Sequence, residues 1–168
     1  RQKGELRKMS DRVIKAALLG LGTVGTGVYK VLKSQEEEMS AKVGCKVEIT
    51  RILVRNIEKA AAKVKDPSVL TNSWESILED PEIEIVIELI GGINPAREYI
   101  LQALNAGKHV VTANKDLIAV HGHELLDAAH AKKVDFLFEA AVAGGIPIIR
   151  PLKQCLAGNH MTEVVGRS

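Results

Sequence analysis

A glycine-rich turn directly after a short apolar run is the strongest constraint in this sequence. Residues 13–19 (V-I-K-A-A-L-L) are almost continuously apolar, which is typical of a strand covered on both faces. Gly20, Gly22 and Gly25 follow as G-x-G-x-x-G, and residues 24–32 then carry valine and leucine at helical spacing. A strand, this turn and an amphipathic helix in succession favour nucleotide binding over a turn that only needs positive φ.

Each glycine has a separate expected role. Gly20 allows the tight turn, and Gly22 lacks the side chain that would block a pyrophosphate. Gly25 lets helix and strand approach closely. The free amides and the dipole at the start of the helix then favour an anion at this turn.

Further strands alternate with helices along the rest of the chain. Strands are expected at residues 46–54, 83–90, 109–112 and 136–138, an alanine- and lysine-rich segment at 57–65, and helices at 74–79, around 100–104, after Asn114 and over 148–156. Asn114 is the expected N-cap of its helix, and Gly107 closes the helix before it. This alternation predicts an α/β fold: a Rossmann-type, doubly wound parallel sheet with right-handed crossovers.

The composition limits the partners and the compartment. The chain of 168 residues is 46% hydrophobic and 26% charged, as expected of one globular domain. A net charge of +2 and 3% aromatic residues argue against nucleic acid. We predict no membrane span, since no apolar run is long enough. We also predict a reducing cytoplasm, since the two cysteines share no spacing typical of a disulfide scaffold or a metal site.

The chain is predicted to consist of a tail and one domain. Residues 1–12 are the predicted tail, with Met9 the natural start and 1–8 derived from expression. Residues 13–168 are the predicted NAD(P)-binding domain.

The end of the second predicted strand indicates which cofactor binds. Sites selective for NAD usually place an acid there, but this strand ends L-V-R-N, with Arg55 at that position and Glu48 too early. An arginine suits a 2′-phosphate through a charge-assisted contact, and Lys59 can assist if its segment is helical. The alternative is a solvated surface arginine. NADP is therefore favoured, with NAD as the alternative.

Three further segments follow predicted strands and would meet at the same crevice. Gly91 and Gly92 let the backbone pass close to a nicotinamide, and Lys115 follows a strand closely enough to reach the same place. Glu139 and the carbonyls of A-V-A-G-G-I-P suit a hard cation. The alternatives are a surface lysine and a helix-capping glutamate. Zinc at H-G-H, residues 121–123, is not favoured because no third ligand is evident.

These segments together resemble the nucleotide-binding half of homoserine dehydrogenase. The matching pieces run from about residue 14 to 166 and are G-L-G-T-V-G-T-G-V, L-V-R-N, E-L-I-G-G-I-N-P-A-R-E-Y-I, G-K-H-V-V-T-A-N-K and F-E-A-A-V-A-G-G-I-P-I-I. The resemblance implies reversible reduction of L-aspartate 4-semialdehyde to L-homoserine with NAD(P)H, in threonine, methionine and isoleucine biosynthesis.

The resemblance also implies roles for individual residues. Matching positions assign pyrophosphate contacts to the backbone of Thr23 and Val24, the 2′-phosphate to Arg55, the loop near the nicotinamide to Ile90 and Gly91, an active-site role to Lys115, and a sodium site to Glu139 with the carbonyls of Val142, Gly144 and Ile146.

Family members continue into a substrate and dimerisation domain whose acidic residues and second lysine are absent from these 168 residues. We therefore expect an isolated domain that binds NADP(H), does not turn over and is mainly monomeric, whereas the full-length family forms homodimers. A non-catalytic NADP-sensing module is the alternative. An enzyme acting on another semialdehyde is a third reading, but neither Cys45 nor Cys155 is placed to act as its nucleophile.

Overall fold

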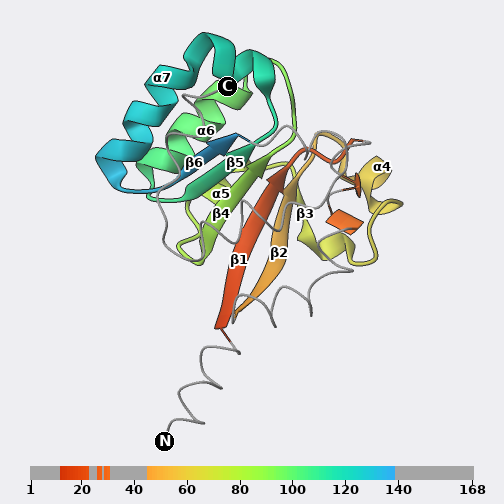
Figure 1. Ribbon diagram of the computed structural model, residues 1–168. Helices are drawn as coiled ribbons and strands as arrows, with labels where there is room; N and C mark the ends of the chain where they lie inside the picture. Colours follow the sequence, from red (N-terminus) through yellow and green to blue (C-terminus); the bar gives the residue numbers. More distant parts are fainter. Residues whose placement is uncertain (1–11, 23–25, 28, 31–44, 139–168) are drawn as a thin grey trace, which may run out of the picture.

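A six-stranded sheet forms the centre of the chain. The computed structural model describes residues 12–22, 26–27, 29–30 and 45–138 (Figure 1). Its strands are β1 (Arg12–Leu19), β2 (Cys45–Leu53), β3 (Leu70–Thr71), β4 (Ile83–Glu88), β5 (His109–Thr112) and β6 (Phe136–Phe138). They lie in the order β3-β2-β1-β4-β5-β6, and every pairing is parallel. This confirms the predicted doubly wound sheet.

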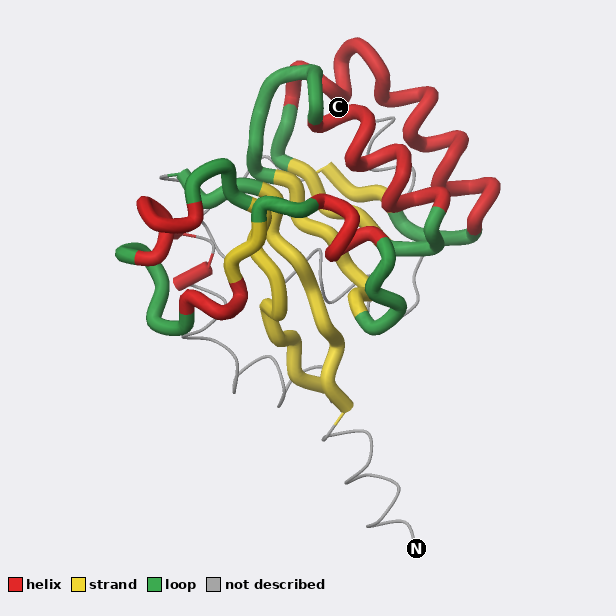
Figure 2. Tube along the Cα trace, turned by 180° about the vertical axis from the view of Figure 1, so that it is seen from behind, coloured by secondary structure: helices red, strands yellow, loops and turns green. Residues whose placement is uncertain are grey.

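Helices connect these strands. They are α4 (Ile57–Ala61), a 3₁₀ turn η1 (Pro67–Val69), α5 (Trp74–Leu78), α6 (Ala96–Asn105) and α7 (Lys115–Lys132). Figure 1 shows α6 and α7 side by side over the β4-β5-β6 half of the sheet, with α4 beside β3 at the other edge. The view from behind shows the same division between the two halves (Figure 2).

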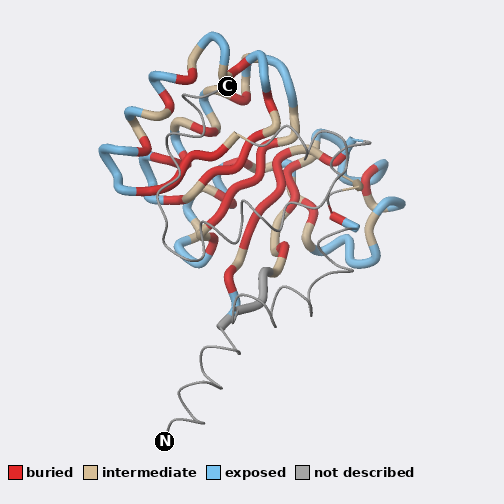
Figure 3. The backbone as a smooth tube through the Cα atoms, in the orientation of Figure 1, coloured by how far each residue is buried: buried red, intermediate tan, exposed pale blue. Residues whose placement is uncertain are grey.

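Both faces of the sheet are buried, which explains the nearly continuous apolar strands. In β1, Ile14, Ala16 and Leu18 belong to one core cluster, while Ala17 and Leu19 belong to the other. The first cluster includes a residue of α4, and the second includes residues of α5, α6 and α7. Figure 3 shows the strands buried along most of their length. Alternate side chains therefore fill two separate cores.

The predicted end of α6 and the predicted start of α7 are confirmed. Asn114 is the N-cap of α7, and its side-chain oxygen accepts a hydrogen bond from the amide of Leu117 at 3.1 Å. Gly107 follows the end of α6 with a φ of +85°, a conformation that glycine adopts without strain.

Two boundaries differ from the predicted ones by more than one residue, and one strand was not predicted. The strand expected over 83–90 ends at Glu88, because the Glu88 carboxylate binds the next two free amides and turns the chain out of the sheet. The segment 57–65 is an α-helix only over Ile57–Ala61. β3 was not predicted, since two residues carry no periodic pattern and the strand exists through its pairing with β2. The helix expected over 148–156 lies outside the described residues.

The described residues include only part of the predicted tail and of the predicted domain. β1 begins at Arg12, one residue earlier than the predicted boundary of the tail, and residues 1–11 lie outside the described part. Within the described residues, no helix is both long and apolar enough to cross a bilayer.

Candidate functional site

A groove of about 790 Å³ lies at the carboxyl end of the sheet. Its walls come from the turn after β1, the end of β2 with α4, and the segment that follows β4, with Pro95 and Tyr99 from the start of α6. The strand order reverses between β1 and β4, so this is the point at which an open parallel sheet offers a ligand crevice.

The glycine turn forms the floor of this groove. Gly20 has a φ of +100°, and its amide donates to the carbonyl of Leu53 at 2.9 Å. A Cβ on Gly20 would make only an ordinary contact, 3.4 Å from Ile90, so it is the positive φ that favours glycine there. Among the described residues, no atom lies within 4 Å of a Cβ on Gly22. The amide of Thr26 donates to the carbonyl of Gly22 at 2.9 Å, and Thr26 and Gly27 are helical.

One wall of the groove carries three cations, Arg55, Lys59 and Lys63. None of the described residues forms a hydrogen bond or ion pair with the side chains of Arg55 and Lys59, and both are exposed. The ammonium of Lys63 donates to the carbonyl of Leu21 at 3.2 Å, so this lysine reaches across to the glycine turn. No acidic residue is found among the described residues that line the groove. The site therefore attracts an anion.

Lys63 was not predicted as a site residue. It lies four residues after Lys59, a spacing that puts two side chains on one face of a helix. That spacing could have indicated Lys63, although α4 ends at Ala61 and the lysine sits in the turn beyond it.

A buried polar network lies at the ends of β4 and β5, and we call its members, Glu88, Thr112 and Asn114, the Glu88 network. Glu88 Oε2 accepts from the amides of Ile90 and Gly91 at 2.9 and 3.0 Å. Glu88 Oε1 accepts from the hydroxyl of Thr112 at 2.6 Å, and that hydroxyl accepts from the amide of Asn114 at 3.0 Å. Nothing in the sequence analysis indicated this network.

The structure brings together some of the predicted site residues. Gly20, Gly22, Arg55 and Ile90 line the groove. Gly91 follows Ile90 but does not line it, and Lys115 is the exposed first residue of α7, also outside the lining. The remaining predicted residues lie outside the described part of the chain: Thr23, Val24 and Gly25 at the turn, and Glu139, Val142, Gly144 and Ile146 at the sodium site.

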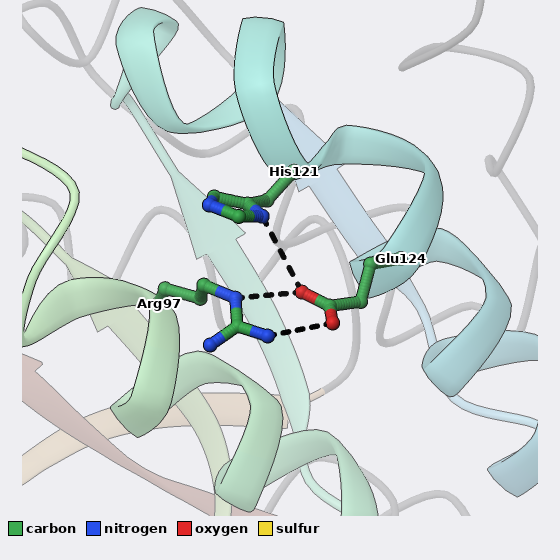
Figure 4. A network of polar contacts seen from close by, with 3 residues as sticks. All are labelled: Arg97, His121 and Glu124. Carbon is green, nitrogen blue, oxygen red and sulfur yellow. Dashed lines mark hydrogen bonds and ion pairs between the residues drawn. The ribbon is translucent and has the colours of Figure 1, made fainter.

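His121 belongs to a surface network instead of a metal pair (Figure 4). Arg97 on α6 binds both carboxylate oxygens of Glu124 on α7, with Nε and the terminal nitrogen at 2.7 and 2.6 Å. His121 Nδ1 lies 3.5 Å from Glu124 Oε1. The hydrogen bond from Arg97 lowers the pKa of Glu124. Within the described residues, no three His, Cys, Asp or Glu side chains group as metal ligands.

A parallel sheet in this order, with a glycine turn and a cationic groove where the order reverses, defines a dinucleotide-binding Rossmann domain. The sequence model described as "Homoserine dehydrogenase, NAD binding domain" matches residues 20–139. The chain belongs to this family, which confirms the resemblance seen in its motifs.

Named relatives agree with this assignment. The chain is 44% identical over 155 residues to the homoserine dehydrogenase of Bacillus subtilis strain 168, a match that covers 92% of this chain and 36% of the relative. It is 47% identical to that of Synechocystis, covering 91% and 35%. The crystal structure of a homoserine dehydrogenase from Thiobacillus denitrificans superposes with a TM-score of 0.73 at 48% identity, over 77% of this chain and 30% of that one. The chain thus spans about a third of the length of its curated relatives.

Proposed function

We propose that this chain binds NADP(H) in the groove, as the cofactor-binding part of a cytoplasmic enzyme that interconverts L-aspartate 4-semialdehyde and L-homoserine. The observation that carries the proposal is the charge of the groove. Three cations and no described acid line it, and two of the cations have no partner among the described residues. A groove of this charge favours a ligand with several phosphates over a neutral one.

The pyrophosphate fits at the glycine turn. Gly22 lines the groove, and among the described residues no atom lies within 4 Å of where its side chain would begin, which leaves this part of the backbone accessible to an anion. Lys63 binds the carbonyl of Leu21 through one of its three N–H groups, and its positive charge remains beside this turn. These contacts support binding of the diphosphate and do not distinguish NAD from NADP.

The other two cations favour the 2′-phosphate of NADP. Arg55 follows the end of β2, and Lys59 lies on α4, which begins two residues later. A guanidinium can bind a phosphate through two parallel hydrogen bonds, and a lysine adds a second charge. The ribose hydroxyl of NAD, in contrast, would find no carboxylate among the described residues of the groove.

The nicotinamide end is assigned to the turn formed by Ile90, Gly91 and Gly92. A nicotinamide cofactor supplies a hydride for carbonyl reduction. Lys115 is expected to lie near the cofactor and substrate, since it begins the helix that follows β5. Glu139 with the carbonyls of Val142, Gly144 and Ile146 stays a predicted sodium site.

We further propose that these 168 residues bind the cofactor without turnover and are mainly monomeric. The family resemblance assigns the substrate-binding acids and the second lysine to a domain that follows the matched segments. Incubation with NADP⁺ and L-homoserine should give no absorbance of reduced cofactor, and sedimentation should give the mass of one chain over a range of concentrations. Detectable homoserine oxidation or a tight dimer would contradict these statements.

Calorimetric titration with NADPH and NADH tests the cofactor assignment. We expect Arg55→Ala to weaken NADPH binding by about 1–3 kcal/mol and to change NADH binding little. Lys65→Ala is the matched control, because it removes one exposed cation outside the groove and should leave both affinities unchanged. Equal losses for both cofactors in Arg55→Ala would argue against a 2′-phosphate contact, and absence of binding by the unaltered chain would overturn the proposal.

A further inference from the structure

We infer that Glu88 is a positioning residue that fixes the turn at the nicotinamide end of the groove and, through Thr112, the start of the helix that carries Lys115. This inference rests on the proposed function, since it assigns a nicotinamide to that end. Glu88 is 0% exposed, although it is a charged residue at the carboxyl end of a central strand.

The hydrogen bonds of Glu88 show why it is buried there. A buried carboxylate is costly unless its oxygens are satisfied, and Glu88 accepts three hydrogen bonds within 3.0 Å. Two of the donors are consecutive backbone amides, of Ile90 and Gly91, and the third is a hydroxyl on the neighbouring strand. The carboxylate thus replaces a sheet partner for amides that have just left the sheet.

The turn is held at both of its ends. Glu88 binds the amides of Ile90 and Gly91, and the side-chain nitrogen of Asn114 donates to the carbonyl of Gly92 at 2.5 Å. Between these anchors, Gly91 and Gly92 have φ values of +82° and +72°. Two consecutive glycines at positive φ have many alternative conformations, so these anchors select one of them.

The same network reaches the start of α7. The hydroxyl of Thr112, which donates to Glu88, also accepts from the amide of Asn114, and Asn114 caps the helix whose first residue is Lys115. Thr112 is 0% exposed and Asn114 is 7% exposed, so water does not readily replace these bonds. One carboxylate therefore sets the position of the turn and of the helix start relative to each other.

The 2′-phosphate, and with it the adenine half of the cofactor, is assigned to a part of the groove that does not depend on the Glu88 network. Arg55 and Lys59 come from the end of β2 and from α4, and no hydrogen bond links their side chains to the Glu88 network within the described residues. A loosened turn should therefore weaken binding of the whole dinucleotide, which must order that turn again. It should leave 2′,5′-ADP, which carries only the adenine half and the 2′-phosphate, unaffected.

Paired variants of Thr112 test this without removing the carboxylate. Thr112→Val keeps the size but removes the hydroxyl, so Glu88 Oε1 and the amide of Asn114 each lose a partner. Thr112→Ser keeps the hydroxyl and is the matched control. By calorimetry we expect Thr112→Val to weaken NADPH about tenfold, with 2′,5′-ADP changed less than about twofold, and Thr112→Ser to bind both ligands as the unaltered chain does.

Glu88→Gln supplies a spectroscopic measurement. A neutral amide oxygen is a weaker acceptor than a carboxylate, so the proton resonances of the Ile90 and Gly91 amides should move upfield and their hydrogen exchange should accelerate in free protein. Unchanged amide resonances and exchange, or equal losses of NADPH and 2′,5′-ADP in folded Thr112→Val, would overturn the role of Glu88. Failure of the unaltered chain to bind either ligand would instead overturn the proposed function, and the role of Glu88 with it.

Discussion

Two neighbouring regions at the carboxyl end of the sheet differ in how their charged and polar side chains are used. At the end of β2, Arg55 and Lys59 are exposed, and no described residue pairs with their side chains. At the ends of β4 and β5, Glu88 and Thr112 are fully buried and bonded to each other and to the adjoining backbone. The cations of the first region can therefore bind a ligand, while the polar groups of the second region form hydrogen bonds within the protein.

This difference separates binding groups from positioning groups. An exposed cation is solvated by water, so it lowers the stability of the folded chain little when no anionic ligand is bound. A buried carboxylate must be satisfied by the protein, and its partners are then fixed in position. We therefore expect changes on the cationic side to alter ligand affinity, and changes in the Glu88 network to alter stability and the geometry of the turn.

The largest expected effect is on stability, from Glu88→Ala. This change leaves the buried hydroxyl of Thr112 and the partly buried amides of Ile90 and Gly91 without their acceptor, and we expect a loss of about 3 kcal/mol in the free energy of unfolding. Urea denaturation measures this loss. Glu98→Ala is the control, because Glu98 is exposed on α6 and its removal should cost less than about 0.5 kcal/mol. Equal losses of unfolding free energy in Glu88→Ala and Glu98→Ala would contradict a structural role for the Glu88 network.

Gly20→Ala should have the next largest effect on stability. Its φ of +100° is unfavourable for any residue with a Cβ, whereas the added atom would make only an ordinary contact, 3.4 Å from Ile90. We expect a loss of about 1–2 kcal/mol in the free energy of unfolding. A variant as stable as the unaltered chain would show that the turn relaxes to a different conformation.

Gly22→Ala should give the reverse result and is the internal control for Gly20→Ala. The added Cβ meets no atom of the described residues within 4 Å, so stability should change by less than about 0.5 kcal/mol. NADPH affinity should fall at least about tenfold, because the methyl group occupies the space assigned to the pyrophosphate. Unchanged NADPH affinity would place the ligand elsewhere.

The smallest effect is expected at the surface network of Arg97, His121 and Glu124, which belongs to neither of the two regions compared above (Figure 4). Arg97 lowers the pKa of Glu124 below its ordinary value of 4.5, so the pair stabilises the fold above that pH and the contribution is lost as the pH falls through the lower pKa of the folded chain. The urea midpoint of Glu124→Gln should therefore lie below that of the unaltered chain at about pH 7, and the difference should shrink as the pH is lowered below 4.5.

Salt should also reduce this difference, because both side chains are accessible to solvent. Asp127→Asn, an exposed change on the same helix, is the control and should show no such pH-dependent difference. A difference for Glu124→Gln that persists in acid would contradict the ion-pair explanation.

Local patterns predicted much of this structure. The run before Gly20 reads as a buried strand, Asn114 as a helix cap and Gly107 as a helix end, because each depends on residues close in sequence. Arg55 was identified by its place relative to a predicted strand, and it does line the groove.

What the sequence did not predict depends on contacts between distant segments. Lys63 binds the carbonyl of Leu21, 42 residues away, and Glu88 binds Thr112, 24 residues away. In the sequence, Glu88 is one polar residue in an alternating strand pattern, as typical of an exposed position as of a buried one. Only the pairing of β4 with β5 puts Thr112 opposite it.

The central claim is that the cations at the end of β2 bind a 2′-phosphate while the glycine turn binds the diphosphate. A crystal structure of this chain grown with NADPH tests it most directly. We expect the 2′-phosphate within hydrogen-bond distance of Arg55 and Lys59, and the pyrophosphate over the backbone of Gly22. An ordered dinucleotide whose 2′-phosphate lies away from Arg55, or whose pyrophosphate does not contact the glycine turn, would contradict the account.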